Sequence, residues 1–125
     1  MSTVRIDIDG RYPDMNKIIN ASRTHWSVAA KLKKDATKQI AAQLPNIILQ
    51  TPIFIEYDFW IPKKCRLDPD NIFGGFQKAF LDALQEKGLI KNDSKKEIVG
   101  FTAYFHDSLN ENYSTVIKIE ECYEE

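Results

Sequence analysis

The sequence predicts a single α+β domain over residues 1–125, with one mixed sheet and two helices, and the spacing of apolar residues carries that prediction. Four short segments are rich in alternating, β-branched or aromatic residues, and two longer segments repeat apolar residues every three to four positions. The resulting order is β-α-β-α-β-β, with no linker or internal repeat. Hydrophobic residues make up 43% of the chain and charged residues 28%, which is typical of a globular domain with one modest core. A sheet covered by helices is the simplest architecture for this order.

The first half of the chain is expected to form a strand, a loop, a helix and a second strand. Residues 3–10, TVRIDIDG, alternate between apolar and polar side chains, as a half-buried strand does. Residues 11–25 show neither period and are expected to form a long loop, of the kind that is usually functional or mobile. Ser27 is the expected N-cap of a helix that Pro45 ends. Residues 51–62, bounded by two prolines, form the second strand.

The second half is expected to form a helix followed by two strands. Pro69 suits the first helical position, Asp68 suits the N-cap, and Gly88 is the expected C-terminal signal. The apolar stripe of this helix, which we expect to be buried, comprises Ile72, Phe76, Phe80, Ala83 and Leu84. Residues 97–105 and 113–121 are expected to pair as an antiparallel hairpin.

Charge is unevenly distributed along the chain, although the net charge is only −1. Residues 1–66 carry 11 Lys and Arg against 6 Asp and Glu, a net of +5, whereas residues 67–125 carry 6 against 12, a net of −6. The basic part is suited to a polyanion such as nucleic acid. Overall charge alone would not have indicated that partner.

The composition predicts a cytoplasmic protein with reduced thiols and no membrane contact. No apolar run approaches the roughly 20 residues that span a bilayer. The first ten residues alternate instead of forming the apolar block of a signal peptide. Cys65 and Cys122 are far apart in sequence and have no metal-ligand spacing, so we expect free structural cysteines rather than a disulfide.

Three aspartates surround the second predicted helix. Asp68 and Asp70 lie at its N-terminal end, and Asp93 follows its C-terminal end. If the fold returns Asp93 to the other two, three carboxylates converge, and such a cluster requires a cation or a protonated member. Oxygen ligands of this kind suit Mg²⁺ or Mn²⁺. Zinc would require suitably spaced His or Cys residues, which His25 and His106 do not provide.

Each acid also has a purely structural interpretation. Asp68 would serve as an N-cap, Asp70 would complement the helix dipole, and Asp93 would be a turn residue. Lys78 and Asp82 have the i,i+4 spacing of a solvated ion pair. Residue types alone leave the metal site and the structural roles both open.

Two adjacent glycines, Gly74 and Gly75, lie inside the same predicted helix. Each costs up to about 1 kcal/mol relative to alanine in a helix interior. Close packing against the sheet would offset this cost. Close approach of another backbone segment, a partner subunit or a nucleic-acid strand would do the same, and the sequence leaves these alternatives open.

The stretch RLDPDNI…KAFLDALQEKGLIKND, between residues 66 and 93, resembles the signature of RusA-type Holliday junction resolvases, especially those of phage and prophage origin. SRTHWS, at residues 22–27, is similar to the segment that leads into the first helix of that family, and the α+β order agrees with its fold. The family consists of homodimeric, Mg²⁺-dependent endonucleases that bind four-way DNA junctions and make paired symmetric nicks.

The resemblance implies a site and a cofactor. Asp68, Asp70 and Asp93 match the catalytic, metal-binding acids, and Lys78 best matches the catalytic lysine. The implied cofactor is Mg²⁺, with Mn²⁺ as a substitute and no organic cofactor. The sequence departs from the family at two positions: Lys78 lies about two turns after Asn71, where compact members have about one turn, and the residue before Asp93 is not an acid.

Basic side chains are expected to bind the phosphates of branched DNA. We predict this role for Arg23, His25, Lys31, Lys34, Lys38, Lys63, Lys64 and Arg66. Each is equally consistent with an ordinary solvated surface. Tyr12 or Trp26 would stack on bases at the crossover, or Trp26 would pack beside the first helix. The alternative function is a dimer on the same fold that binds DNA branches or another protein without cutting.

Overall fold

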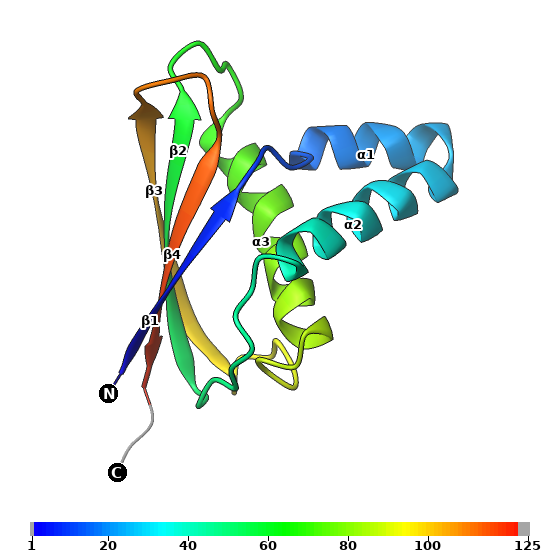
Figure 1. The fold of residues 1–125 in the computed structure, drawn as a ribbon. Helices are drawn as coiled ribbons and strands as arrows, with labels where there is room; N and C mark the ends of the chain where they lie inside the picture. Colours follow the sequence, from blue (N-terminus) through cyan, green and yellow to red (C-terminus); the bar gives the residue numbers. More distant parts are fainter. Residues whose placement is uncertain (1, 123–125) are drawn as a thin grey trace.

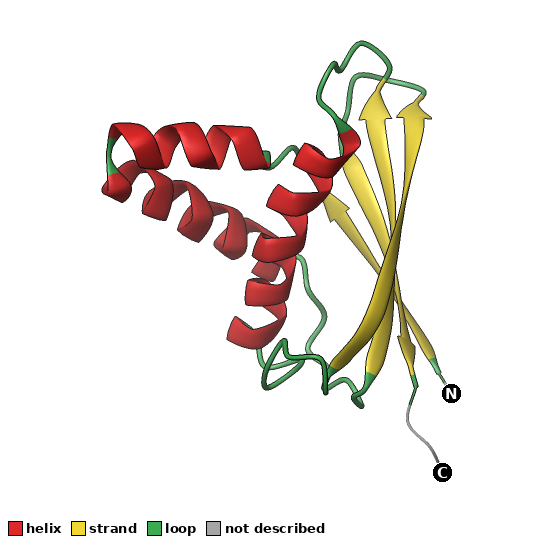
Figure 2. Ribbon diagram, turned by 180° about the vertical axis from the view of Figure 1, so that it is seen from behind, coloured by secondary structure: helices red, strands yellow, loops and turns green. Residues whose placement is uncertain are grey.

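The computed structural model describes residues 2–122 and contains three helices and one four-stranded sheet. The elements are β1 (Thr3–Asp9), α1 (Met15–Thr24), α2 (Trp26–Ala41), β2 (Ile53–Pro62), α3 (Pro69–Glu86), β3 (Ile98–Ser108) and β4 (Ser114–Glu121). The predicted α+β class with one mixed sheet is confirmed. All three helices lie on one face of the sheet, and Figures 1 and 2 show the opposite face without a covering element.

The strands lie in the order β1-β4-β2-β3, so the predicted hairpin between the last two strands is wrong. β2 pairs parallel with β3 on one side and antiparallel with β4 on the other. The physical reason is the crossover through α3, because a helix between two strands returns the second strand parallel to the first. The alternation of apolar and polar residues identified β3 and β4 as strands. It specifies which face of a strand is buried, but not which strand lies beside it.

A helix, α1, occupies most of the segment that was expected to be a loop, and that expectation is wrong. Asp14 caps α1 by accepting a hydrogen bond from the backbone N–H of Lys17 at 3.0 Å. No residue of Met15–Thr24 is fully buried. The segment has only ten residues and few large apolar side chains (Met15, Ile18 and Ile19), so its helical period is short and easily missed. Only His25 separates α1 from α2, and the two helices form a helical hairpin, called here the arm (residues 15–41).

The second helix of the arm begins two residues earlier than expected. The N-cap of α2 is His25, whose Nδ1 accepts a hydrogen bond from the N–H of Ser27 at 3.2 Å, so the predicted cap at Ser27 is wrong. The C-terminal half of α2 buries Ala36 and Ile40 against the rest of the domain, whereas Val28 near its start is exposed. One end of the arm is therefore packed and the other end projects into solvent, as Figure 1 shows.

The core lies between the sheet and the helices and is rich in aromatic rings. Phe76 packs edge-to-face on Phe59 with ring centroids 5.4 Å apart, and Tyr57 contacts Phe80 in the same way at 5.8 Å. Of the predicted α3 stripe, all members are buried except Ile72, which is half-buried. Gly88, with φ of +81°, ends the helix as predicted. One contiguous cluster of this kind is consistent with the predicted single domain.

Two further sequence-based expectations concern thiols and membranes. Cys65 and Cys122 are both free cysteines, as predicted. Among residues 2–122, none of the helices combines the length and the apolar composition needed to cross a bilayer.

Glu121 links the end of β4 to two other segments, and this linkage predicts a pH dependence of stability. Its carboxylate accepts hydrogen bonds from the hydroxyl of Ser2 and the backbone N–H of Gln50, and these bonds lower the pKa of Glu121. Because the folded pKa lies below the unfolded value of about 4.3, the stabilisation is present above that pH and is lost as pH falls through the folded pKa. We expect Glu121→Gln to lower the Tm at pH 7, with a smaller difference at about pH 3. Thermal unfolding at both pH values measures this, and an equal difference at both would contradict it.

Candidate functional site

The N-terminus of α3 presents two exposed carboxylates, and that of Asp70 is also placed to complement the helix dipole. Asp68 stands at the N-cap position, but its side chain makes no capping hydrogen bond. Asp70 lies in the first turn, and both residues are exposed. Neither takes part in any of the ion pairs found among residues 2–122. Capping therefore does not account for Asp68, and both carboxylates are accessible to a ligand.

Asp93 lies at the other end of α3. The helix has 18 residues, which corresponds to about 27 Å at the usual rise. Asp93 follows its C-terminus, in the exposed connection that leads to β3. Within residues 2–122, no group of three or more His, Cys, Asp or Glu side chains is placed to hold a metal ion. One chain thus does not bring Asp93 to Asp68 and Asp70, and the donor set expected for Mg²⁺ is incomplete in a single copy.

Lys78 is also separated from the acid pair. It lies ten residues after Asp68 on the same helix, or about 15 Å along the helix axis. Its Nζ is 3.3 Å from Oδ1 of Asp82. This contact is the solvated i,i+4 ion pair that the sequence offered as the structural alternative to a catalytic role for Lys78. The cations nearest to the acids in sequence are those of the connection between β2 and α3. These residues are Lys63, Lys64 and Arg66, and all three are exposed.

The glycine pair of α3 allows another backbone segment to approach closely. A methyl group on Gly75 would lie 2.2 Å from the carbonyl oxygen of Pro13 and 3.0 Å from backbone atoms of Asp14. A methyl group on Gly74 would meet only the side chain of Met15, at 3.1 Å from Cε. Of the alternatives left open by the sequence, approach of a backbone segment is the one observed. Gly75 lets the chain that leads into the arm pass directly against α3.

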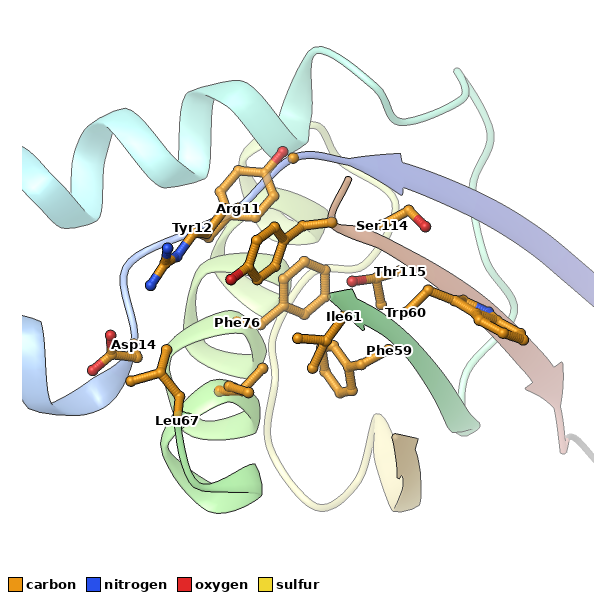
Figure 3. Close-up of a pocket in the computed structure, with 13 residues that line it drawn as sticks. Arg11, Tyr12, Asp14, Phe59, Trp60, Ile61, Leu67, Phe76, Ser114 and Thr115 are labelled. Atoms are coloured by element: carbon orange, nitrogen blue, oxygen red, sulfur yellow. The ribbon is translucent and has the colours of Figure 1, made fainter. Parts of the chain in front are cut away.

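The base of the arm and the segment before Asp68 share a small cavity of about 30 Å³. Figure 3 shows Arg11, Tyr12 and Asp14 from the connection between β1 and α1 around it, together with Leu67, which immediately precedes Asp68. The Arg11 guanidinium carbon lies 5.0 Å from the ring centroid of Tyr113, within cation–π range. The packed end of the arm is therefore adjacent to the acid pair.

Tyr12 is a structural residue of this region and not an exposed stacking residue. Its hydroxyl donates a hydrogen bond to the carbonyl oxygen of Asp9 at 2.6 Å and accepts one from Nε2 of Gln43 at 2.9 Å. Its ring packs edge-to-face on Phe76 at 5.8 Å. Burial is the main reason that the pKa of Tyr12 is raised. The expectation that Tyr12 would stack on DNA bases is therefore not supported.

The arm is strongly basic. Its cations, all exposed, are Lys17, Arg23, Lys31, Lys33, Lys34 and Lys38. The only acid in residues 15–41 is Asp35, which pairs with Lys31 at 3.0 Å, so the arm carries a net charge of +5. Five of the eight predicted DNA-binding residues lie here, and the other three lie in the connection before α3. Two exposed cations of the arm, Lys17 and Lys33, were not among the predicted DNA-binding residues.

A pair on the outer face of the sheet was also missed. Nε2 of His106 lies 2.7 Å from Oδ1 of Asp58, and the His106 ring stacks on Trp60 with centroids 4.4 Å apart. The parallel register of β2 and β3 sets Trp60 opposite His106, and Asp58 lies two residues before Trp60 on the same face of β2. No sequence signal specifies that register. His106 also lines a cleft of about 130 Å³ together with Pro69, the first residue of α3.

Comparison with known protein families gives no match for this sequence, and comparison with curated proteins finds no significant relative. The resemblance between residues 66–93 and RusA-type resolvases therefore stays a hypothesis that those residues carry.

Proposed function

We propose that this protein is a Mg²⁺-dependent endonuclease that resolves four-way DNA junctions by paired symmetric nicks in recombination and repair. The observation that carries the proposal is the acid pair at the start of α3. Asp68 occupies a capping position without capping, and Asp70 stands exposed beside it. A basic connection directly precedes both acids. Carboxylates next to cations are suited to hold a phosphate group together with a metal ion.

The roles of the residues follow from their positions. Asp68 and Asp70 would hold the metal ion, and Lys63 and Arg66 would bind the phosphates beside the scissile bond. When bound, Mg²⁺ would supply a water of lowered pKa and neutralise charge on the phosphate oxygens. The arm would bind a second duplex of the junction through its exposed cations.

The proposed enzyme is a homodimer, and the exposed edge of β3 is the proposed interface. Among residues 2–122, β3 pairs only with β2, and no charged residue occurs between Ile98 and Phe105. Phe101 is 51% exposed and Tyr104 50% exposed. The opposite edge strand, β1, is protected by charged side chains, as edge strands usually are. An unprotected edge with apolar side chains favours pairing with another strand.

A second copy fits this edge because the pattern of β3 is self-complementary. Antiparallel pairing centred on Ala103 would set Phe101 of one copy opposite the partner's Phe105, on the face that the helices cover. Such a pairing is isologous, since each contact occurs twice. It also reverses the direction of β3, so the start of one β3 would lie beside the end of the other. The end of β3 is level with the end of β2, where the connection to Asp68 begins. Asp93 of the partner subunit would therefore approach Asp68 and Asp70.

Mixing two inactive variants tests this shared site. We expect Asp70→Asn and Asp93→Asn each to be inactive alone, because each removes one acid from both sites of the dimer. A mixed dimer restores one intact site, since Asp70 of one copy and Asp93 of the other are then unaltered. Nicking of a labelled junction by the remixed variants is the measurement. If the mixture stays inactive although subunits exchange, the acids of one chain act together and the shared site is wrong.

Cleavage of synthetic substrates tests the function itself. We expect Mg²⁺-dependent nicking of a four-way junction, with weaker or no cutting of duplex, flap and three-way substrates. Affinity should fall about 10³-fold or more between 50 and 200 mM salt if six or more phosphates are contacted. If linear duplex is cut as fast as the four-way junction, the protein is a nuclease without specificity for junctions.

A second candidate function is supported by the incomplete acid set of one chain. A protein that binds DNA branches without cutting needs the basic arm but not Asp93. Junction binding without cleavage in Mg²⁺ or Mn²⁺ would favour this candidate. Against it stands the acid pair, because a binder of polyanions does not benefit from exposed carboxylates beside its cations.

A further inference from the structure

The projecting end of the arm carries an aromatic side chain that nothing in the domain covers. Trp26, the first residue of α2, is 74% exposed, which is the highest value among the aromatic residues of the described chain. Its ring stacks on His25 with centroids 6.0 Å apart and planes 24° from parallel. The alternative that Trp26 packs beside the helix is therefore wrong. A large flat apolar surface held in this way is suited to stack on another ring.

The charge around Trp26 indicates the class of ligand. Arg23 precedes it in the last turn of α1 and Lys31 follows it on α2, within an arm of net charge +5. A membrane surface also attracts basic helices, but membrane binding requires a broad apolar face on the helix. The apolar face of α2 is buried against the domain at Ala36 and Ile40, and the large apolar side chains exposed near its start are Trp26 and Val28, too few to form a broad apolar face. A negatively charged ligand with flat rings, a nucleic acid, fits both properties of the arm.

We propose that Trp26 and His25 form a stacking site for an unpaired nucleobase, with Arg23 and Lys31 on the adjacent phosphates. Duplex bases are already stacked on one another, so only unpaired bases, in single strands or opened at a branch point, offer a free face. This inference rests on the proposed function in one respect, that the arm binds DNA, and it does not depend on cleavage. It assigns to the arm a selectivity for unpaired bases that phosphate contacts alone do not supply.

Tryptophan fluorescence provides a direct test. The chain has two tryptophans, so Trp60→Phe leaves Trp26 as the only one. Trp60 lies on β2 and lines the cavity of Figure 3, but it is not assigned a role in cleavage or in nucleic-acid binding. DNA is titrated into this variant without divalent metal, so that binding is measured in the absence of cleavage. We expect single-stranded oligothymidylate to quench Trp26 emission, and blunt duplex of equal length to bind without quenching. Equal quenching by both ligands, or by neither although both bind, would overturn the stacking site.

Substitution of Trp26 gives an independent readout. Base–aromatic stacking corresponds to about 5- to 150-fold in affinity, so Trp26→Ala should weaken single-strand binding by that factor and leave duplex binding unchanged. Trp26→Phe should retain most of the affinity. The matched control, Lys34→Ala on the same helix, should weaken both ligands equally because it removes only a phosphate contact.

The outcomes distinguish the stacking site from the proposed function. If Trp26→Ala weakens both ligands equally or neither, the stacking site is wrong and DNA binding by the arm stands. If the native chain binds neither ligand, the DNA-binding part of the proposed function fails together with the inference. If Trp26→Ala changes the molecular mass in solution, Trp26 belongs to an interface between copies and the inference is overturned.

Discussion

Replacing Asp70 by asparagine is expected to abolish junction cleavage, with a fall of at least about 100-fold in the nicking rate. Asparagine keeps the shape of the side chain but removes the charge and one of the two equivalent oxygens that bind a hard cation. Loss of an outer residue that only supports a metal ligand already costs about 10–100-fold, so loss of a ligand should cost more. Junction affinity without divalent metal should not fall, because an acid beside the phosphates contributes repulsion.

A matched variant on the same helix controls for charge and stability. Asp82→Asn makes the same substitution three turns further along α3, where the acid pairs only with Lys78. It should leave cleavage unchanged and cost a few tenths of a kcal/mol in stability. Single-turnover nicking of a labelled four-way junction compares the two variants. Wild-type cutting by Asp70→Asn in Mg²⁺ would refute the assignment of Asp70.

The parts of the fold that could be predicted are those determined by local pattern. Alternation identified β1, and the proline and glycine signals identified both ends of α3. The neighbour of β3 could not be predicted in the same way, because strand order depends on which side of β2 the crossover helix returns to. α1 was missed for another reason. It has only ten residues with few large apolar side chains, buries none of them completely, and is stabilised by its cap at Asp14 and by contacts with α2.

The candidate site also has a part that local sequence predicts and a part that depends on the fold. Asp68 and Asp70 are two residues apart in sequence, so their proximity needed no knowledge of the fold. Asp93 was assigned by motif position, and it follows the far end of α3, a helix about 27 Å long. A motif records which residues act together but not which copy of the chain supplies each one. This difference is the reason that the proposed site requires a second subunit.

Replacing Gly75 by alanine is expected to lower the free energy of unfolding by about 1–2 kcal/mol. The added methyl group would lie 2.2 Å from a backbone oxygen of Pro13, and rotation of a side chain cannot relieve that contact. Overpacking of this kind costs about 1–3 kcal/mol and is only partly offset by the better helix propensity of alanine. Gly74→Ala is the matched control, since its methyl group meets only the flexible end of Met15. It should be neutral or stabilising by up to about 1 kcal/mol, and urea unfolding with an unchanged m-value measures both.

The same substitution should also uncouple the arm from the acid pair. The segment that Gly75 accommodates, Pro13 and Asp14, leads directly into α1, so relief of the clash requires the base of the arm to move away from α3. At a temperature where both variants are fully folded, Gly75→Ala should bind junctions more weakly than Gly74→Ala. The reason is that the arm and the connection before Asp68 would no longer have the relative position needed to contact one junction at the same time. Isolated single strand contacts only the arm, so its affinity should differ little between the two variants. If junction affinity is equal in both, the position of the arm relative to α3 does not matter for binding, and the glycine serves stability alone.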